Sequence, residues 1–486
     1  MSPGLILGCI GAYFAFLLGI AWITSRQAGN AAYFLGNRAS PWYVVAFGLL
    51  GDSLSGVTFI SVPGRVQASQ FSYLQVVLGY VAGYVVIAHV LLPLYYRLQL
   101  TSIYTYLEYR MGTTAQRTGS AFFLLSRLLG AAARLYLAAG VAQRFVFGAW
   151  GVPFWLSVVG IIGLILLYTY RGGIKTLVWT DTFQSGFLLL GLVLSVAAIA
   201  GAMHLGPGDL LRAVWESPYS RVFVWGWSPA NSFWKEFLGG AFIAICMTGL
   251  DQNMMQKNLS CRSLTEAQRN LHWFAGIVVF VNALFLALGS LLYRYAETQG
   301  IALPSQTDLL FPTLALERLG GFAAVVFLLG LMAATFSSAD SVLTTLTTSF
   351  CIDILGMERR RHWSEARRTR LRHVFHLVFA VLLLGAILTF EARGSEAVIQ
   401  LVLKIANYTY GPLLGLFAFG ILTRRAANGR WVPFVALTAP VVCAMLDLNA
   451  ARWFGGYRFG NELLLLNGGL TFLGLWLSGG LFRTRT

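Results

Sequence analysis

Near its centre, the apolar segment from Gly320 to Phe350 carries the run Met332-Ala333-Ala334-Thr335-Phe336-Ser337-Ser338-Ala339-Asp340-Ser341. Small residues and hydroxyls lead up to a carboxylate here, inside a segment long and apolar enough to cross a membrane as a helix. An ionisable side chain at bilayer depth costs roughly 2.5–3.5 kcal/mol on insertion scales, so an intramembrane Asp marks a candidate functional site. Hydroxyl and carboxylate oxygens are hard ligands, and the run therefore predicts a site for a small cation.

The whole chain has the composition of a polytopic membrane protein rather than of an ordinary soluble domain. Of its 486 residues, 57% are hydrophobic and 11% are charged, and the mean hydropathy is +0.68. Apolar stretches of about 20 residues or more, the length of a transmembrane helix, recur from end to end. The sequence predicts an all-α fold that fills 1–486 as a single membrane domain. Its thirteen predicted transmembrane helices are 3–24, 42–64, 72–96, 118–148, 152–170, 177–202, 234–255, 271–296, 320–350, 373–390, 396–422, 431–448 and 462–482.

The distribution of basic residues predicts the orientation of these helices. The first segment lacks a basic n-region and a small-residue cleavage site, which is typical of a retained helix and not of a removed signal peptide. With the N-terminus outside and the C-terminus in the cytoplasm, most Lys and Arg residues fall on the cytoplasmic side, as the positive-inside rule requires. This topology counts Lys257 among the cytoplasmic loop residues. Short loops suit a bacterial inner (plasma) membrane.

The net charge of +16 is explained by the same membrane orientation. Basic residues sit in short loops between apolar segments, where they contact anionic lipid, so nucleic acid is not an expected partner. The basic run from Arg359 to Arg372 is interpreted as an inside anchor, with a lipid or partner site as the alternative. The five cysteines show no paired spacing, which argues against a disulfide framework or a zinc site.

The second predicted span is interrupted near its centre. Residues 48–56 read Gly-Leu-Leu-Gly-Asp-Ser-Leu-Ser-Gly, so Asp52 and two serines lie between glycines. Irregular backbone inside a membrane is tolerated where it lines a cavity, and a discontinuous helix offers free carbonyls to a cation and a half-helix terminus to a solute. Glycine-mediated helix packing is the alternative. The presence of Asp52 favours the functional interpretation.

Two more polar segments interrupt apolar spans. A glycine turn at 170–176 precedes Asp181, which is a candidate ion ligand, an exit-path residue, or an acid favoured by the positive end of a helix dipole. The run 248–259 interrupts the seventh span. Loop polarity explains its second half, whereas Asp251 and Gln252 lie closer to the membrane interior.

Taken in order, these motifs resemble those of the sodium:solute symporters, the family of the sodium/glucose, proline, sialic acid, iodide and multivitamin carriers. The resemblance covers nearly the whole chain. It rests on four segments, which are 95–110 (YYRLQLTSIYTYLEYR), 171–184 (RGGIKTLVWTDTFQ), 251–268 with its Asp-Gln, Gln-Lys and Glu-Ala-Gln elements, and 337–341 (SSADS).

The resemblance implies a LeuT-like core of two inverted five-helix repeats. The repeats would span 42–202 and 234–422, with an extra helix at 3–24 and two more within 431–482. It also implies a secondary symporter that imports a small polar organic solute, such as a carboxylate, a sugar or a vitamin, by alternating access. Sodium is the implied coupling ion, with no organic cofactor, no obligate protein partner and no enzymatic activity.

The resemblance also implies a sodium site made of neutral oxygens. Its members are the carbonyls of Gly51, Leu54 and Ala334 and the hydroxyls of Ser337 and Ser338. Five such oxygens suit a dehydrated sodium ion that must be released again.

Some relatives bind a second sodium ion, and the matching positions here are Asp181, Ser337, Asp340 and Ser341. Asp340 departs from the family pattern, which has a hydroxyl-bearing or small residue there. Its charge would strengthen a second ion site or hold a proton.

For the solute, the resemblance points to Ser53, Thr58, Gln75 and Asp251, with Asp52 beside them at the break. Arg134, in the fourth span, would clasp a carboxylate with two hydrogen bonds. The alternative for Arg134 is an internal ion pair with Asp52 or Asp251. Lys404 is a further intramembrane charge, which faces the cavity or reaches the membrane surface.

Three alternatives to a sodium symporter follow from the same residues. A symporter of this fold driven by protons would use Asp52, Asp181 or Asp340. A membrane sensor is disfavoured because no kinase or relay domain follows the last predicted helix. An enzyme is disfavoured because the six histidines form no metal set and no nucleophile–base or phosphate-loop motif occurs.

Overall fold

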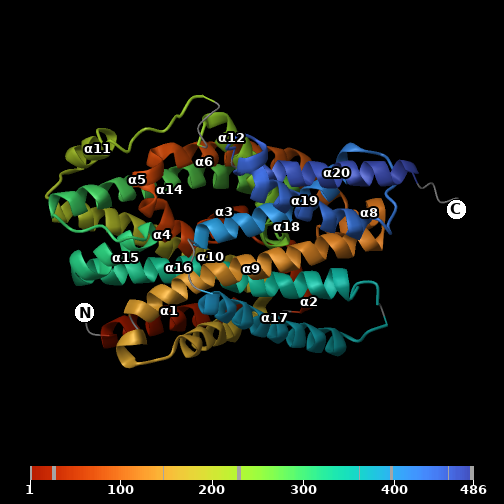
Figure 1. The fold of residues 1–486 in the computed structure, drawn as a ribbon. Coiled ribbons are helices and arrows are strands. Elements are labelled where there is room, and N and C mark those ends of the chain that lie inside the picture. The colour runs from red at the N-terminus through yellow and green to blue at the C-terminus, as the bar shows by residue number, and fades with distance from the viewer. Residues whose placement is uncertain are drawn as a thin grey trace.

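The computed structural model describes residues 3–24, 29–145, 147–226, 231–360, 362–393, 398–457 and 459–481. These residues form a bundle in which most long helices run roughly parallel to one axis (Figure 1). The α-helices are α1 (Pro3–Thr24), α2 (Asn30–Leu35), α3 (Trp42–Ser53), α4 (Gly56–Gly64), α5 (Val66–Ser69), α6 (Tyr73–Val86), α7 (Leu92–Arg97), α8 (Thr105–Met111), α9 (Thr113–Phe145), α10 (Phe154–Ala202), α11 (Pro207–Trp215), α12 (Phe233–Ala244), α13 (Gln252–Asn258), α14 (Leu264–Thr298), α15 (Leu310–Thr313), α16 (Gly320–Ser349), α17 (Glu365–Arg393), α18 (Val398–Leu422), α19 (Val432–Trp453) and α20 (Leu463–Leu481).

Apolar helices confirm the predicted all-α membrane fold. In the part of the chain that the structure describes, seven helices are long and apolar enough to cross a membrane, and two bent helix pairs qualify as further spans. Shorter apolar helices occupy Gly11–Thr24, Phe154–Tyr170, Tyr408–Leu422 and Leu463–Gly479. The number of thirteen spans stays a prediction, because helix length and composition alone do not require each of these four to cross.

The two bent pairs lie where the sequence predicted interrupted helices. The pair α3 and α4 bends by 59° where Leu54 leaves the helical conformation (φ −99°, ψ 67°). The second pair, α12 with its π-helical extension to Gly249 followed by α13, bends by 69°. Asp251 is extended at this second break and caps α13, because its side chain accepts a hydrogen bond from the Met254 N–H.

The second half of the polar run 248–259 is not a loop, and this part of the sequence interpretation was wrong. Residues Gln252–Asn258 form α13, which is buried along its whole length. The assignment of Lys257 to a cytoplasmic loop was wrong for the same reason, since its side chain is only 1% exposed. The side chains of Gln256 and Lys257 donate to partners inside the bundle that lie far away in the sequence, the Phe34 carbonyl and the Asp52 carboxylate among them.

The glycine turn between the fifth and sixth predicted spans is present as a sharp kink. Gly173, inside α10, has φ 53° and ψ −147°, which separates the apolar pieces Phe154–Tyr170 and Gly173–Ala202. A Cβ at this position would lie 2.5 Å from the Tyr33 side chain and backbone, so only glycine fits.

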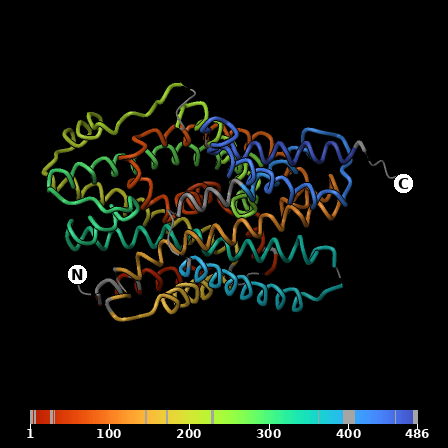
Figure 2. The backbone as a smooth tube through the Cα atoms, in the orientation of Figure 1, coloured from red at the N-terminus to blue at the C-terminus, as the bar shows by residue number. Residues whose placement is uncertain are grey.

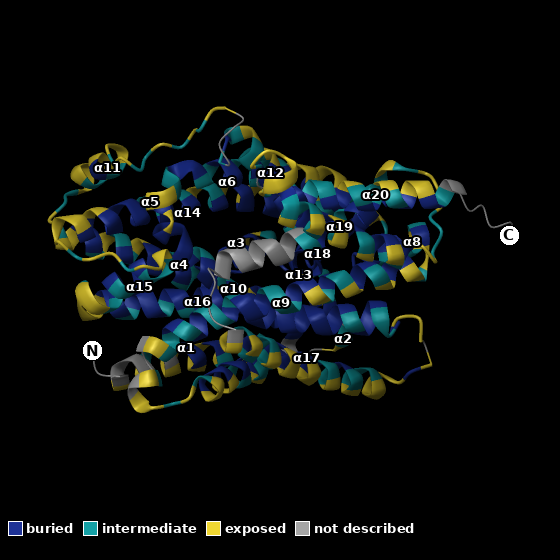
Figure 3. Ribbon diagram, viewed as in Figure 1, coloured by how far each residue is buried: buried dark blue, intermediate teal, exposed yellow. Residues whose placement is uncertain are grey.

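Helix α16, which carries the run quoted first, is the most enclosed of the long spans. In its most apolar window 78% of residues are buried, compared with 28% in α17 and in α19. Figure 3 shows this difference as a largely buried α16 beside a mostly exposed α17. In Figure 2, α1 and α17 lie on one flank of the bundle and the blue C-terminal helices lie on the opposite flank. The hydroxyls and carboxylate of α16 therefore lie inside the protein, away from lipid.

Candidate functional site

A cavity of about 490 Å³ opens beside the break between α3 and α4. Of the residues predicted to bind solute, Asp52, Ser53, Thr58 and Arg134 line it, and so does Leu54 at the break. Much of the remaining wall is apolar or aromatic and comes from α4, α6, the α12 segment and α14, including Val57, Val76, Tyr80, Tyr84, Met247 and Val278. The wall also carries further charged residues, Arg65, Lys235, Glu236 and Glu462, so the cavity combines polar and charged groups with an apolar surface, as sites for small organic molecules do.

Gln75 and Asp251, also predicted to contact solute, are engaged elsewhere. The Gln75 side chain is fully buried; it donates to the Ser72 and Asn231 carbonyls at 3.2 and 3.0 Å and accepts from the Val224 N–H at 3.0 Å. Gln75 therefore fastens the segment before α12 onto α6. Asp251 is also fully buried, beneath the cavity wall.

Asp251 forms a two-pronged ion pair with Arg127 of α9. Arg127 donates from Nε at 2.6 Å and from Nη2 at 2.8 Å, and the Tyr410 hydroxyl donates to the same carboxylate at 2.5 Å. This geometry is the strong bidentate form of an Arg–carboxylate contact. The internal ion pair considered for Arg134 is thus made by Arg127.

Arg134, two turns further along α9, has a different environment. It lines the cavity and forms no hydrogen bond or ion pair with any residue that the structure describes. The residue as a whole is partly exposed, and its side chain lines the cavity. The side chain of Lys404, the other charge singled out in the sequence, lies outside the described residues.

The predicted sodium ligands meet where α3 approaches α16. The Ser338 hydroxyl donates to the Gly51 carbonyl at 3.4 Å and to the Ala334 carbonyl at 3.5 Å. The Ser337 hydroxyl donates to Asp181 Oδ1 at 3.1 Å. A Cβ on Gly51 would lie 2.3 Å from the Ser337 oxygen, so this close approach of the two helices requires glycine. Three of the five predicted ligands are therefore joined by direct contacts, and the Leu54 carbonyl follows at the break.

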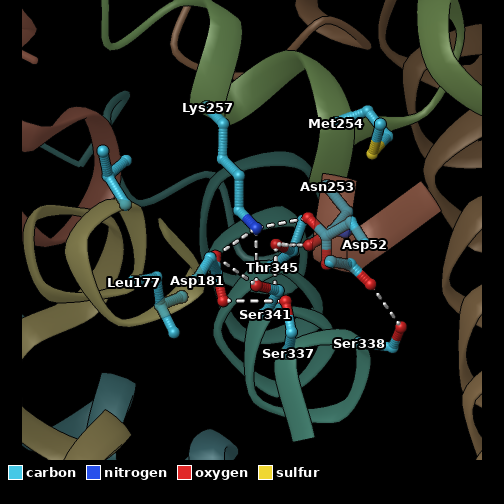
Figure 4. Close-up of polar contacts among 12 residues, drawn as sticks. Asp52, Leu177, Asp181, Asn253, Met254, Lys257, Ser337, Ser338, Ser341 and Thr345 are labelled. Atoms are coloured by element: carbon cyan, nitrogen blue, oxygen red, sulfur yellow. Dashed lines mark hydrogen bonds and ion pairs between the residues drawn. The ribbon is translucent and has the colours of Figure 1, made fainter. Parts of the chain in front are cut away.

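The centre of the bundle holds a charge cluster that the sequence interpretation missed. Lys257 Nζ forms ion pairs with Asp52 and Asp181 and donates to the Ser341 hydroxyl at 2.8 Å. Figure 4 shows Lys257 reaching from α13 to a point between Asp181 and Ser341. Each carboxylate side chain is at most 1% exposed. The two predicted intramembrane acids, Asp52 and Asp181, were the signal that could have revealed it. A buried charge is stable only when it is paired, so these acids require a buried cation nearby.

Asp340, assigned to a second sodium site, faces a different neighbour. Its carboxylate accepts from the Tyr168 hydroxyl at 2.9 Å and from the Ser341 backbone N–H at 2.6 Å. Asp181, Ser337 and Ser341 are linked to one another, because the Ser341 hydroxyl donates to Asp181 at 3.2 Å. No hydrogen bond among the described residues joins the Asp340 carboxylate to Asp181 or Ser337.

A comparison with protein families identifies the chain. The model of the sodium:solute symporter family matches residues 33–430. The chain belongs to this family. The symporter is 28% identical to sodium-coupled monocarboxylate transporter 1 of Mus musculus, over 93% of this chain and 71% of the mouse protein. It is 26% identical to the sodium/sialic acid symporter NanT of Aliivibrio fischeri, over 90% of this chain and 86% of that protein.

Solved structures show the same fold. The structure of a Na⁺-coupled sialic acid symporter, described as a substrate-bound outward-open state with a novel Na⁺ site, matches this symporter with a TM-score of 0.83 at 22% identity. The match covers 99% of this chain and 98% of that one. The predicted family is confirmed, and its members named here are transporters with sodium as the coupling ion.

Proposed function

We propose that this protein imports a small monocarboxylate together with sodium, using Arg134 to recognise the carboxylate. The observation that carries the proposal is the position of Arg134, whose guanidinium has no partner among the described residues and lies in the wall of a cavity that adjoins the predicted sodium ligands. A guanidinium presents paired N–H groups that match a carboxylate, so an anionic solute would complete its hydrogen bonds.

The surroundings of Arg134 support a solute with one charged end. Near the break, Asp52 is neutralised by Lys257 and Arg127 by Asp251, so neither provides a free charge for the solute. The other charged residues of the wall, Arg65, Lys235, Glu236 and Glu462, comprise two basic and two acidic side chains. The apolar wall formed by Val57, Val76 and Met247 would contact the rest of the molecule. The named solutes of the two relatives, a monocarboxylate and sialic acid, both carry a carboxylate, whereas a neutral sugar would leave Arg134 unpaired. Ser53 and Thr58 would supply hydrogen bonds to a polar substituent.

The sodium ion in this proposal binds between α3 and α16. Its ligands would be the carbonyls of Gly51, Leu54 and Ala334 and the hydroxyls of Ser337 and Ser338. Direct contacts already hold Ser338 against Gly51 and Ala334. Sodium at this point would stabilise the break that also presents Asp52 and Ser53 to the cavity, which ties ion binding to the shape of the solute site.

The proposal includes a topology for alternating access. In this topology the long, bent and short apolar helices would together make thirteen spans. The N-terminus would lie outside and the C-terminus in the cytoplasm, with the protein in an inner (plasma) membrane. One bent pair opens each proposed repeat, at 42–202 and at 234–422, as expected for an inverted-repeat transporter in which one bundle rocks against the other. Membrane lipid, sodium and the solute are the partners that this scheme requires.

Thermal stability in the presence of solutes tests the proposal. The purified protein would be heated with a panel of carboxylates, sugars, amino acids and vitamins, in sodium chloride and again in choline chloride. Binding to the folded state raises the apparent stability by mass action. We expect short monocarboxylates to stabilise the protein in sodium only. Stabilisation by neutral sugars, or by carboxylates equally in both salts, would contradict the proposal.

A second candidate is coupling to protons, which the environment of Asp340 favours. This buried acid forms no ion pair among the described residues and accepts a hydrogen bond from Tyr168. In this scheme Asp340 would take up a proton on one side of the membrane and release it on the other, in place of sodium. Uptake driven by an acidic exterior in sodium-free potassium buffer would favour this candidate, and no uptake under those conditions would exclude it.

A further inference from the structure

The Lys257 ammonium group is fully satisfied by three acceptors. A lysine side chain has three N–H donors and no acceptor. They are matched by the Asp52 carboxylate, the Asp181 carboxylate and the Ser341 hydroxyl, which come from three different helices, α3, α10 and α16. The Lys257 side chain is 1% exposed, so these contacts are shielded from bulk solvent. The ammonium is thus a compact, buried positive charge surrounded by oxygens.

Two of these three acceptors belong to the oxygen set that the family resemblance assigned to a second sodium ion. Asp181 and Ser341 contact the ammonium directly, and Ser337 is linked to it through Asp181. Asp340, the remaining member of that set, is turned to Tyr168. A sodium ion there would have to share lone pairs with the ammonium and lie next to a like charge, which is strongly unfavourable where the dielectric constant is low.

The first sodium site does not have this conflict. Ser338, Gly51 and Ala334 form no hydrogen bond with Lys257. The Ser337 hydroxyl uses its proton for Asp181, which leaves its oxygen lone pairs available to a cation.

We propose that the Lys257 ammonium is a tethered cation that takes the place of the second sodium ion, so that this symporter binds one sodium ion per protein molecule. The proposal rests on the function proposed above. A second sodium ion at the oxygens of Asp181, Ser337 and Ser341 would neutralise the buried acid of α10 and join that helix to α16. In this protein the Lys257 ammonium neutralises Asp181 and joins α10 to α16, and it also connects α3 and α13 to them. Because the ammonium is covalently attached, it is not released during the transport cycle.

Equilibrium binding of radioactive sodium to the purified protein tests this count. We expect the wild type to saturate at one ion per molecule up to several hundred millimolar sodium, and Ser338→Ala to weaken this binding. The decisive variant is the double substitution Lys257→Met with Asp52→Asn. It removes one positive and one negative charge together, so the net buried charge is unchanged, while the oxygens of Asp181, Ser337 and Ser341 become free.

The double variant is expected to bind two sodium ions per molecule. Asp52→Asn alone is the matched control, because it keeps the ammonium, and it is expected to bind one. Two ions in the wild type, or a single ion in a folded double variant, would overturn the proposal and leave sodium coupling intact. No sodium binding by the wild type would overturn the proposed function together with this count. The wild-type count is informative even if the double variant does not fold.

Discussion

Arg127 and Arg134 lie two turns apart on α9, yet they have opposite environments. Both line the cavity, but Arg127 is 5% exposed and bound to Asp251 through two hydrogen bonds, whereas Arg134 has no hydrogen bond or ion pair with any described residue. Residue type and spacing alone cannot distinguish an arginine that stabilises the fold from one that binds a ligand. The presence of a carboxylate partner makes that distinction here.

Replacing Arg134 with glutamine is expected to weaken carboxylate binding. A hydrogen bond to a charged group contributes about 1.5–3 kcal/mol, so the loss corresponds to about 10- to 150-fold in affinity. The measurement is the solute half-saturation for uptake into proteoliposomes, with the thermal midpoint of the purified variant close to that of the wild type. An unchanged half-saturation would remove Arg134 from the solute site.

Arg127→Gln is the matched control for this variant. It leaves the Asp251 carboxylate buried without its cation, and breaking such a pair by removing one partner costs about 3–5 kcal/mol. We therefore expect a clear fall in the thermal midpoint, with or without solute. Both variants replace arginine with glutamine, so a difference in their thermal midpoints or solute affinities reflects the different surroundings of the two arginines.

Ser338→Ala is expected to raise the sodium concentration needed for half-maximal binding. The variant removes one neutral oxygen ligand, and a contact of about 0.5–1.5 kcal/mol corresponds to about 2- to 12-fold. Ser341→Ala is the control, because the Ser341 hydroxyl contacts Lys257 and Asp181 and not Gly51 or Ala334. Equal sodium affinities in the two variants would contradict the assignment of Ser338.

At the scale of elements, the contact between α3 and α16 depends on one missing side chain. In Gly51→Ala the new Cβ would lie 2.3 Å from the Ser337 oxygen and 2.9 Å from its Cβ. Such overpacking typically costs about 1–3 kcal/mol, and here it would move the Gly51 carbonyl away from Ser338. We expect both a lower thermal midpoint and weaker sodium binding.

Gly186→Ala, on α10, provides the comparison for Gly51→Ala. A Cβ at Gly186 meets no atom within 4 Å, so the substitution is expected to leave sodium binding unchanged and to stabilise the helix slightly. Normal sodium binding by Gly51→Ala would show that the close approach of α3 and α16 is not needed for the ion site.

The same elements show how far sequence reasoning could reach. The breaks after Gly51 and near Asp251 were predictable because glycine and polar residues inside an apolar span are a local signal. The burial of Lys257 was not, since a polar run looks alike in a loop and in a buried helix. Its partners Asp181 and Asp52 lie 76 and 205 residues away, so only the tertiary fold brings the charges together. The hydrogen bonds of Gln75 were likewise not predictable, because the backbone groups of Asn231 and Val224 that it binds belong to another segment.

At the scale of the whole molecule, the sodium ligands and the cavity share the break between α3 and α4. Gly51 carries a proposed ion ligand, while Asp52 and Ser53, which directly follow it in α3, line the cavity. Asp52, next to this break, forms an ion pair with Lys257 of α13, and Lys257 in turn contacts Asp181 of α10 and Ser341 of α16. The ion and the solute would therefore both bind next to the break, and each would influence its position.

This arrangement predicts reciprocal coupling between sodium and the solute. By linkage, if sodium raises the affinity for a monocarboxylate by some factor, the monocarboxylate must raise the affinity for sodium by the same factor, typically about 5- to 150-fold. Both affinities can be measured on the purified protein by calorimetry or equilibrium binding. Ser338→Ala should reduce the two factors together, because it weakens the ion that joins α3 to α16. If the solute affinity does not change with sodium, the two sites are not coupled through the break. The transport cycle would then need a different coupling element. The buried acid Asp340 is the first candidate for that element.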